Sequence, residues 1–144
     1  MTASGTPTLV LLGLSLALFV ASLFLPAIVG PTFRHSGFGC LAGGWAMLIG
    51  IVSRPAWFVS WLANPLYLAT LVFWRRGAGS LGYAALPATA LICALVALAI
   101  HDFPPNEAQS EVPVTLGPAT YVWIAAMVVA VAAALLPVLS RRAP

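Results

Sequence analysis

The sequence predicts an all-α integral membrane protein, a single domain over residues 1–144 built as a bundle of four transmembrane helices and one shorter apolar helix. Three observations support this fold class. The chain is 62% hydrophobic and 6% charged, and its mean hydropathy is +1.05. A soluble domain carries about 25% charged residues. The apolar segments also recur at a length of about 20 residues, which matches the hydrocarbon core of a bilayer.

The first span is predicted over residues 8–29, and Gly30-Pro31 ends it. The residues before it carry no positive charge and no A-x-A site follows it, so we expect a retained helix and not a cleaved signal peptide. Small residues recur here at every fourth position and offer a face that another helix backbone can approach closely. These residues are Gly13, Ala17 and Ala21.

Residues 38–52 form a shorter apolar segment that leaves two architectures open. Fifteen helical residues reach about 22 Å, which is less than the ~30 Å hydrocarbon core. We therefore expect a short re-entrant or interfacial helix, and hence four transmembrane helices. The alternative is a tilted crossing with five transmembrane helices, which would place five arginines on one side of the membrane and Arg54 alone on the other.

The clearest span covers residues 56–74, which are uncharged and lie between Arg54 and the pair Arg75–Arg76. Its middle is marked by Asn64-Pro65. Because Pro65 has no backbone N–H, it frees the carbonyl of Trp61 four residues earlier. We expect a kinked but continuous helix whose Asn64 amide bonds within the protein, either to that carbonyl or to another helix. Aromatic residues near both ends are typical of a lipid–water boundary, namely Trp57, Trp61, Phe73 and Trp74.

Two further spans are predicted over residues 81–100 and 119–139. Each carries small residues at every fourth position: Ala85, Thr89, Cys93 and Ala97 in the first, and Ala126, Ala130 and Ala134 in the second. The loop 101–118 between them is rich in proline, so we expect it to be extended and without a helix of its own. This loop holds all three acids of the chain, Asp102, Glu107 and Glu111.

Arginine positions predict the orientation. Arginine clusters resist translocation across the membrane, so loops and tails that carry them stay in the cytoplasm. This rule places residues 75–80 and the C-terminal tail in the cytoplasm and the acidic loop outside. A composition rich in alanine, with arginine as the only basic residue, favours a bacterial origin and hence the bacterial inner membrane. The clusters are Arg75–Arg76 and Arg141–Arg142.

The sequence offers little chemistry. The predicted spans carry no charged residue, which argues against a proton path through an embedded carboxylate. Cys40 and Cys93 form no CxxC pair, and buried cysteine usually acts as a small hydrophobe. His35, His101 and Asp102 are expected to be solvated loop residues and not metal ligands. A hydrolytic site built from Ser53, His101 and Asp102 has no supporting motif. We therefore expect no enzyme and no cofactor.

Several short motifs occur together between residues 19 and 76: Leu25-Pro26-Ala27, Cys40, Gly44-Trp45 and the run Trp61-Leu62-Ala63-Asn64-Pro65-Leu66. In this combination the chain resembles a loose group of small uncharacterised bacterial multi-pass membrane proteins. The resemblance implies the class of protein and its compartment. It implies no activity, because none is known for that group.

The sequence therefore favours a non-catalytic accessory or scaffolding subunit that packs against other membrane helices. The alternative is a small homo-oligomeric transporter or channel, with Asn64 and the glycine-rich segment 38–52 lining its path. Expected partners are the lipid bilayer and other membrane subunits or further copies of this chain, and not nucleic acid. The candidate helix-packing or hinge residues are Asn64, Pro65, Gly13, Ala17, Ala21, Ala126, Ala130 and Ala134.

Overall fold

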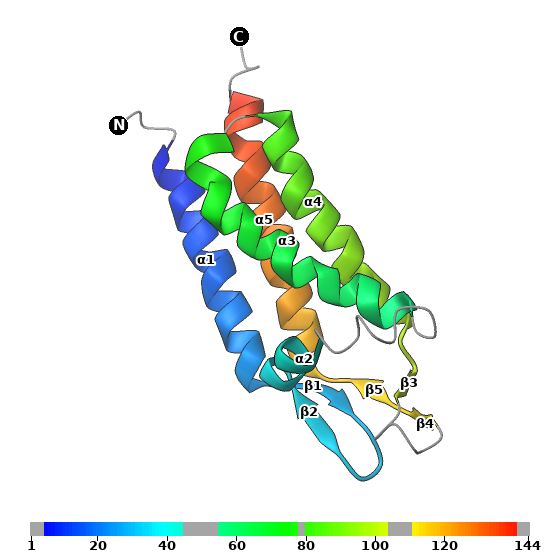
Figure 1. The fold of residues 1–144 in the computed structure, drawn as a ribbon. Helices are drawn as coiled ribbons and strands as arrows, with labels where there is room; N and C mark the ends of the chain where they lie inside the picture. Colours follow the sequence, from blue (N-terminus) through cyan, green and yellow to red (C-terminus); the bar gives the residue numbers. More distant parts are fainter. Residues whose placement is uncertain (1–4, 45–54, 78–79, 104–110, 141–144) are drawn as a thin grey trace.

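The computed structural model describes residues 5–44, 55–77, 80–103 and 111–140. Four helices in these ranges are long and apolar enough to cross a membrane, and they run alongside one another as a bundle (Figure 1). The prediction of an all-α membrane bundle is therefore confirmed. The long helices are α1 (Gly5–Phe24), α3 (Pro55–Gly77), α4 (Leu81–Leu95, continued by the 3-10 helix η2, Val96–Ala99) and α5 (Pro118–Ser140).

The bundle has two different ends. The start of α1, the end of α3, the start of α4 and the end of α5 lie at one end, which we call the termini end. The short helix α2 (Gly37–Gly43) and the strands lie at the other, which we call the capped end (Figure 1). The indole N–H of Trp61, in the second turn of α3, donates to the carbonyl of Leu41 in α2 at 3.2 Å. Helix α2, which holds the first part of the predicted segment 38–52, and the start of α3 thus lie at the same end of the bundle, and the described residues contain four helices long and apolar enough to cross a membrane; residues 45–52 lie outside the described residues.

The predicted first span, residues 8–29, is wrong at its C-terminal end. Helix α1 stops at Phe24, and residues Pro26–Val29 form strand β1. Sterics disfavour helical geometry for the residue before a proline, so Leu25-Pro26 ends the helix. The freed strand is the middle of a three-stranded antiparallel sheet, between β2 (Arg34–Ser36) and β5 (Thr115–Leu116).

The loop 101–118 contains no helix before α5 in its described parts, residues 101–103 and 111–117, as predicted. Its strands were not predicted. Besides β5, the loop holds β3 (Asp102–Phe103) and β4 (Val112–Pro113), which pair with each other. Because β5 pairs with β1, the loop 101–118 is hydrogen-bonded to the segment that follows α1. Glu107 lies outside the described residues.

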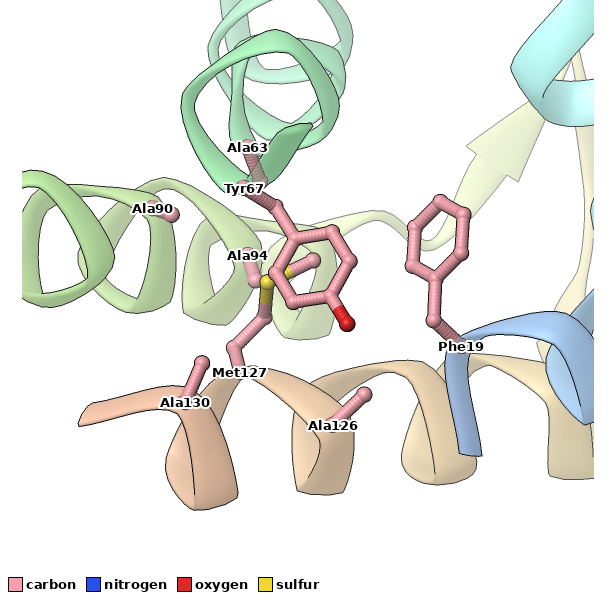
Figure 2. Close-up of a cluster of buried hydrophobic side chains, with 8 residues drawn as sticks. All are labelled: Phe19, Ala63, Tyr67, Ala90, Ala94, Ala126, Met127 and Ala130. Atoms are coloured by element: carbon pink, nitrogen blue, oxygen red, sulfur yellow. The ribbon is translucent and has the colours of Figure 1, made fainter. Parts of the chain in front are cut away.

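Alanines let the helices pack closely at the centre of the bundle. Figure 2 shows Tyr67 of α3, Phe19 of α1 and Met127 of α5 directed toward one another, with alanines of α3, α4 and α5 around them. The rings of Phe19 and Tyr67 stack with centroids 4.8 Å apart. Helix α1 packs on α5, α5 on α4 and α4 on α3. The surrounding alanines are Ala63, Ala90, Ala94, Ala126 and Ala130.

One buried hydroxyl pair ties three helices together. The Ser15 hydroxyl of α1 donates to the carbonyl of Ala126 in α5 at 2.7 Å. The Tyr67 hydroxyl of α3 lies 2.9 Å from the same Ser15 oxygen. Since a serine hydroxyl has a single proton, Tyr67 is the donor of this second bond. The hydroxyls of Ser15 and Tyr67 are thereby satisfied inside the apolar bundle, as burial requires.

The three series of small residues face different ways. Ala126, Ala130 and Ala134 are buried in the core. Gly13, Ala17 and Ala21 are exposed on α1, whose buried face instead carries Thr8, Leu12, Ser15, Phe19 and Ser22. In the third series, Ala85 and Thr89 are exposed and Ala97 is buried. The α5 series therefore packs helices within this chain, the α1 series does not, and the third series is divided between the two.

Candidate functional site: a cavity at the capped end

A cavity of about 240 Å³ lies between the ends of the four helices and the cap formed by α2 and the strands. All four long helices contribute to its wall, as do α2, β1, β2, β3 and β5. In Figure 1, α3 leans away from α1 toward the capped end, and α2 lies between them. This divergence leaves space that alanine-mediated packing closes in the other half of the bundle.

Helix α3 supplies one whole face to the cavity, through Trp57, Ser60, Trp61 and Asn64. Their spacing of three, one and three residues puts them on one side of a helix. The Ser60 hydroxyl donates to the carbonyl of Trp57 in its own helix at 2.9 Å. Its proton is therefore used, while its oxygen can still accept a hydrogen bond.

Asn64 forms the hydrogen-bonded corner of this wall. Its amide nitrogen donates to the Trp61 carbonyl at 3.1 Å, the carbonyl that Pro65 frees. Its amide oxygen accepts from the indole N–H of Trp123 in α5 at 3.0 Å. The prediction that Asn64 bonds within the protein is confirmed, and both expected partners are present. Helix α3 continues through Pro65, and one amide N–H of Asn64 has no partner among these bonds.

The start of α5 and strand β1 form the adjoining wall. The hydroxyl of Thr120 donates to the carbonyl of Ala27 at 3.0 Å, and the backbone N–H of Gly117 donates to the same carbonyl at 2.8 Å. A Cβ on Gly117 would overlap the carbonyl of Pro26, so this close approach requires glycine. These bonds hold Thr120 and Trp123 of α5 at the cavity surface.

Helix α2 supplies a wall with little side chain. Ser36 caps its start by accepting from the N–H of Gly39 at 3.1 Å. A Cβ on Gly44 would overlap the indole of Trp61, so that glycine serves close packing. Gly39 and Gly43, four residues apart, also line the cavity, and a Cβ on Gly43 would meet no atom within 4 Å. At Gly39 and Gly43 the cavity wall is helix backbone, and Cys40 and Leu41 of the same helix add side chains to it.

Cys40 of α2 also lines the cavity. Burial raises the pKa of its thiol to about 11. A thiol is nucleophilic as the thiolate, so near neutral pH Cys40 is a protonated, weak hydrogen-bond donor. Cys93 lies in α4, in the membrane-spanning part, and does not line this cavity.

Four rings cluster at the cap, and three of them reach the cavity. Phe103 is the centre: its ring centroid lies 4.9 Å from that of Trp57, 5.0 Å from His35 and 5.5 Å from Phe33. His35 and Phe33 are 5.3 Å apart. Trp57, His35 and Phe103 line the cavity. His35 is thus part of an aromatic cluster, where the sequence indicated a solvated loop.

No acid, arginine or lysine is found among the described residues that line the cavity. Within the same part of the chain, no three histidine, cysteine or acidic side chains are placed to hold a metal ion. His101 and Asp102 lie at the capped end with exposed side chains, and they do not line the cavity. Ser53, considered above for a hydrolytic site, lies outside the described residues.

Comparison with protein-family models, with curated proteins and with solved structures gives no match for this chain.

Sequence reasoning found Asn64 and missed most of the other residues of this site. Trp57 and Trp61 were interpreted as residues of a lipid–water boundary, and the bond from Trp123 to Asn64 was not predicted. One sequence signal was available: these three tryptophans all fall near span ends that are predicted to lie on the same side of the membrane. Phe103 and Thr120 carry no local pattern that distinguishes them.

Proposed function

We propose that this chain is a non-catalytic integral membrane protein that binds a small uncharged molecule in the cavity at its capped end. The observation that supports this is a cavity of about 240 Å³ with mostly apolar walls and no acid, arginine or lysine among its described lining residues. Ligand sites are typically concave, apolar pockets with a few placed polar groups. A charged ligand would lose its hydration here without a counter-charge, which costs much free energy.

The polar groups of the cavity support binding and not catalysis. The hydroxyl protons of Ser60 and Thr120, and the amide oxygen and one amide N–H of Asn64, are engaged in bonds that hold the fold. A nucleophile needs an adjacent base or a lowered pKa, and burial shifts the pKa of the Cys40 thiol upward. The chain is accordingly assigned no reaction.

The transporter alternative has less support. A path from the cavity to the termini end would have to pass Phe19, Tyr67 and Met127, which fill the centre of the bundle (Figure 2). Tyr67 and Met127 have no exposed surface. Passage through one copy would therefore require these packed helices to separate.

An accessory-subunit role is the second candidate, and one observation favours it. The series Gly13, Ala17 and Ala21 is exposed on α1, and a Cβ on Gly13 would meet nothing within 4 Å. Small residues on a membrane-exposed face allow another helix to approach. The replacement Ala17→Leu should then release a partner from native membranes in mild detergent while the chain stays folded. A chain that purifies alone from those membranes would remove this candidate.

The capped end is proposed to face outward from a bacterial inner membrane. Arg75 and Arg76 lie in the last turn of α3, at the end opposite the cap, which favours a cytoplasmic location for the termini end of the bundle. In a cysteine-free background, Thr32→Cys should react from outside with an impermeant thiol reagent, and Ser140→Cys should not. The reverse pattern would invert the orientation and leave the binding proposal intact.

Binding itself is tested by thermal unfolding of the detergent-purified full chain with phenol and cyclohexanol as uncharged probes and benzoate as a charged one. We expect at least one uncharged probe to raise the unfolding midpoint and benzoate to have no effect. Gly43→Leu, which places a side chain at the cavity wall, should abolish the increase. Gly82→Leu is the matched control, because a Cβ there also meets nothing within 4 Å but lies in α4 away from the cavity. Equal shifts in both variants would contradict the proposal.

A further inference from the structure

The walls of the cavity differ from one another, and this difference indicates which class of uncharged ligand they fit. One side includes the backbone of helix α2 at Gly39 and Gly43, which carry no side chain. The other sides present large flat rings, the indoles of Trp57, Trp61 and Trp123 and the ring of Phe103. These rings are held in place, since two of the three indoles donate hydrogen bonds, to Leu41 and to Asn64.

We propose that the ligand of this cavity is a small neutral molecule with a planar aromatic ring and one hydroxyl or carbonyl group. The inference rests on the binding function proposed above and adds the class of ligand. Aromatic rings gain from stacked or edge-to-face contact with other rings, beyond the surface they bury. Fixed indoles give such contacts without losing further side-chain freedom, whereas a saturated ring or an alkyl chain gains only the burial.

The volume fits one ring with substituents. An apolar cavity of about 150 Å³ is sufficient to bind benzene. At about 240 Å³ the present cavity exceeds that by the room needed for a polar group or a second small ring.

The hydroxyl or carbonyl group of the ligand would bind to two side chains of α3. Asn64 and Ser60 lie one helical turn apart on the cavity face of α3. Asn64 retains one amide N–H, and the Ser60 oxygen can accept a bond because its proton is given to Trp57. A hydroxyl on the ligand can thus accept from Asn64 and donate to Ser60, and a carbonyl can use the first of these bonds.

The test uses phenol and cyclohexanol, which have the same number of heavy atoms and the same hydroxyl but differ in aromaticity. The full chain is labelled with fluorotryptophan and studied by fluorine NMR in detergent micelles, with each signal assigned by a Trp→Phe variant. Trp57, Trp61 and Trp123 report on the cavity, and Trp74, which packs near Tyr83 at the termini end, is the internal control.

We expect phenol to shift the cavity signals and leave Trp74 unmoved, with an affinity about twofold to tenfold higher than that of cyclohexanol. Ser60→Ala should weaken phenol binding and leave the binding of toluene unchanged. Equal shifts and affinities for phenol and cyclohexanol, both lost in Gly43→Leu, would overturn the aromatic preference while the binding function stands. If neither probe moves the cavity signals, or if Trp74 moves equally, both proposals fail.

Discussion

From the centre of the bundle to the termini end the inner face of α5 is filled by neighbouring helices, whereas toward the capped end the inner face of α3 borders open space. Ala126, Ala130 and Ala134 in the first region have almost no exposed surface. Trp57, Trp61 and Asn64 in the second line a cavity of about 240 Å³. Small side chains thus bring helices together in one half, and large rings stand at the wall of a cavity in the other.

Residue size alone therefore does not determine packing in this membrane bundle. Alanine closes a contact when the opposing helix is free to approach, as α5, α4 and α1 do around Tyr67. At the capped end the sheet and α2 occupy the space between the helix ends, so the helices cannot close. Rings then pack against the cap, and a volume remains that they do not fill.

Adding the same side-chain volume to both halves should change the free energy of unfolding by very different amounts. Ala130→Leu places a leucine where no surface is exposed, and overpacking of this kind costs about 1–3 kcal/mol of unfolding free energy. Gly43→Leu should cost far less, because its side chain enters open space. Denaturant titration of the full chain in micelles measures both.

Ala132→Leu is the control for this pair, since Ala132 is exposed on the same helix as Ala130. It should leave the free energy of unfolding nearly unchanged. Ala130→Leu is expected to lower the stability of the monomer itself, because Ala130 is buried within this chain. An equal cost at positions 130 and 132 would show that the buried face is assigned wrongly.

Two adjacent glycines provide the next largest effect. Gly44→Ala should destabilise the chain by about 1–2 kcal/mol, because its Cβ overlaps Trp61 and displaces the indole from the Leu41 carbonyl. Gly43→Ala, one residue earlier, should be nearly neutral. Thermal unfolding with tryptophan fluorescence follows stability and the Trp61 environment together. A neutral Gly44→Ala would mean that the Trp61 contact is loose.

Asn64→Leu should have a smaller effect, about 1 kcal/mol. The variant loses the bonds to the Trp61 carbonyl and the Trp123 indole, and hydrogen bonds in membrane proteins average about 0.6 kcal/mol each. Thr70→Val is the matched control, because the side-chain hydroxyl of Thr70 bonds only within α3, to the carbonyl of Leu66. Complete loss of folded protein in Asn64→Leu would give this amide a much larger structural role.

The smallest effect on folding is expected from the thiol of Cys40, which should affect reactivity alone. Burial raises its pKa to about 11, so the thiolate fraction near pH 7 is about one part in ten thousand and grows as the pH rises toward 11. In a Cys93→Ala background, the rate of maleimide labelling should be lower by a factor of about a hundred or more than at Thr32→Cys, an exposed position. Fast labelling at neutral pH would place Cys40 in open solvent.

Much of the fold could be predicted from local sequence. The long apolar segments gave four spans, and Gly77 ends α3 directly after Arg75–Arg76. The bond from Asn64 to Trp61 also follows from sequence, since a proline frees a carbonyl at a fixed distance along the helix and the amide lies within reach. Each of these features depends on residues within a few positions of one another.

The site could not be predicted in this way. Strand β1 was interpreted as the end of a helix, because Ala27, Ile28 and Val29 are as apolar as the residues before them. Its strand character depends on pairing with β5, nearly ninety residues later, where Ile28 faces Leu116. Thr120, bonded to Ala27, is informative only once that pairing brings α5 to the sheet.

Local sequence is sufficient to identify which segments are long and apolar enough to span a membrane and how the carbonyl freed by Pro65 is satisfied. Only the tertiary structure decided which faces of those segments meet. In a soluble protein, polarity separates the two faces of a helix. In lipid the solvent is as apolar as the core, so the exposed Gly13–Ala17–Ala21 face and the buried Ala126–Ala130–Ala134 face have the same sequence signature. The cavity arises where the cap keeps those faces apart, which is a property of the assembled bundle.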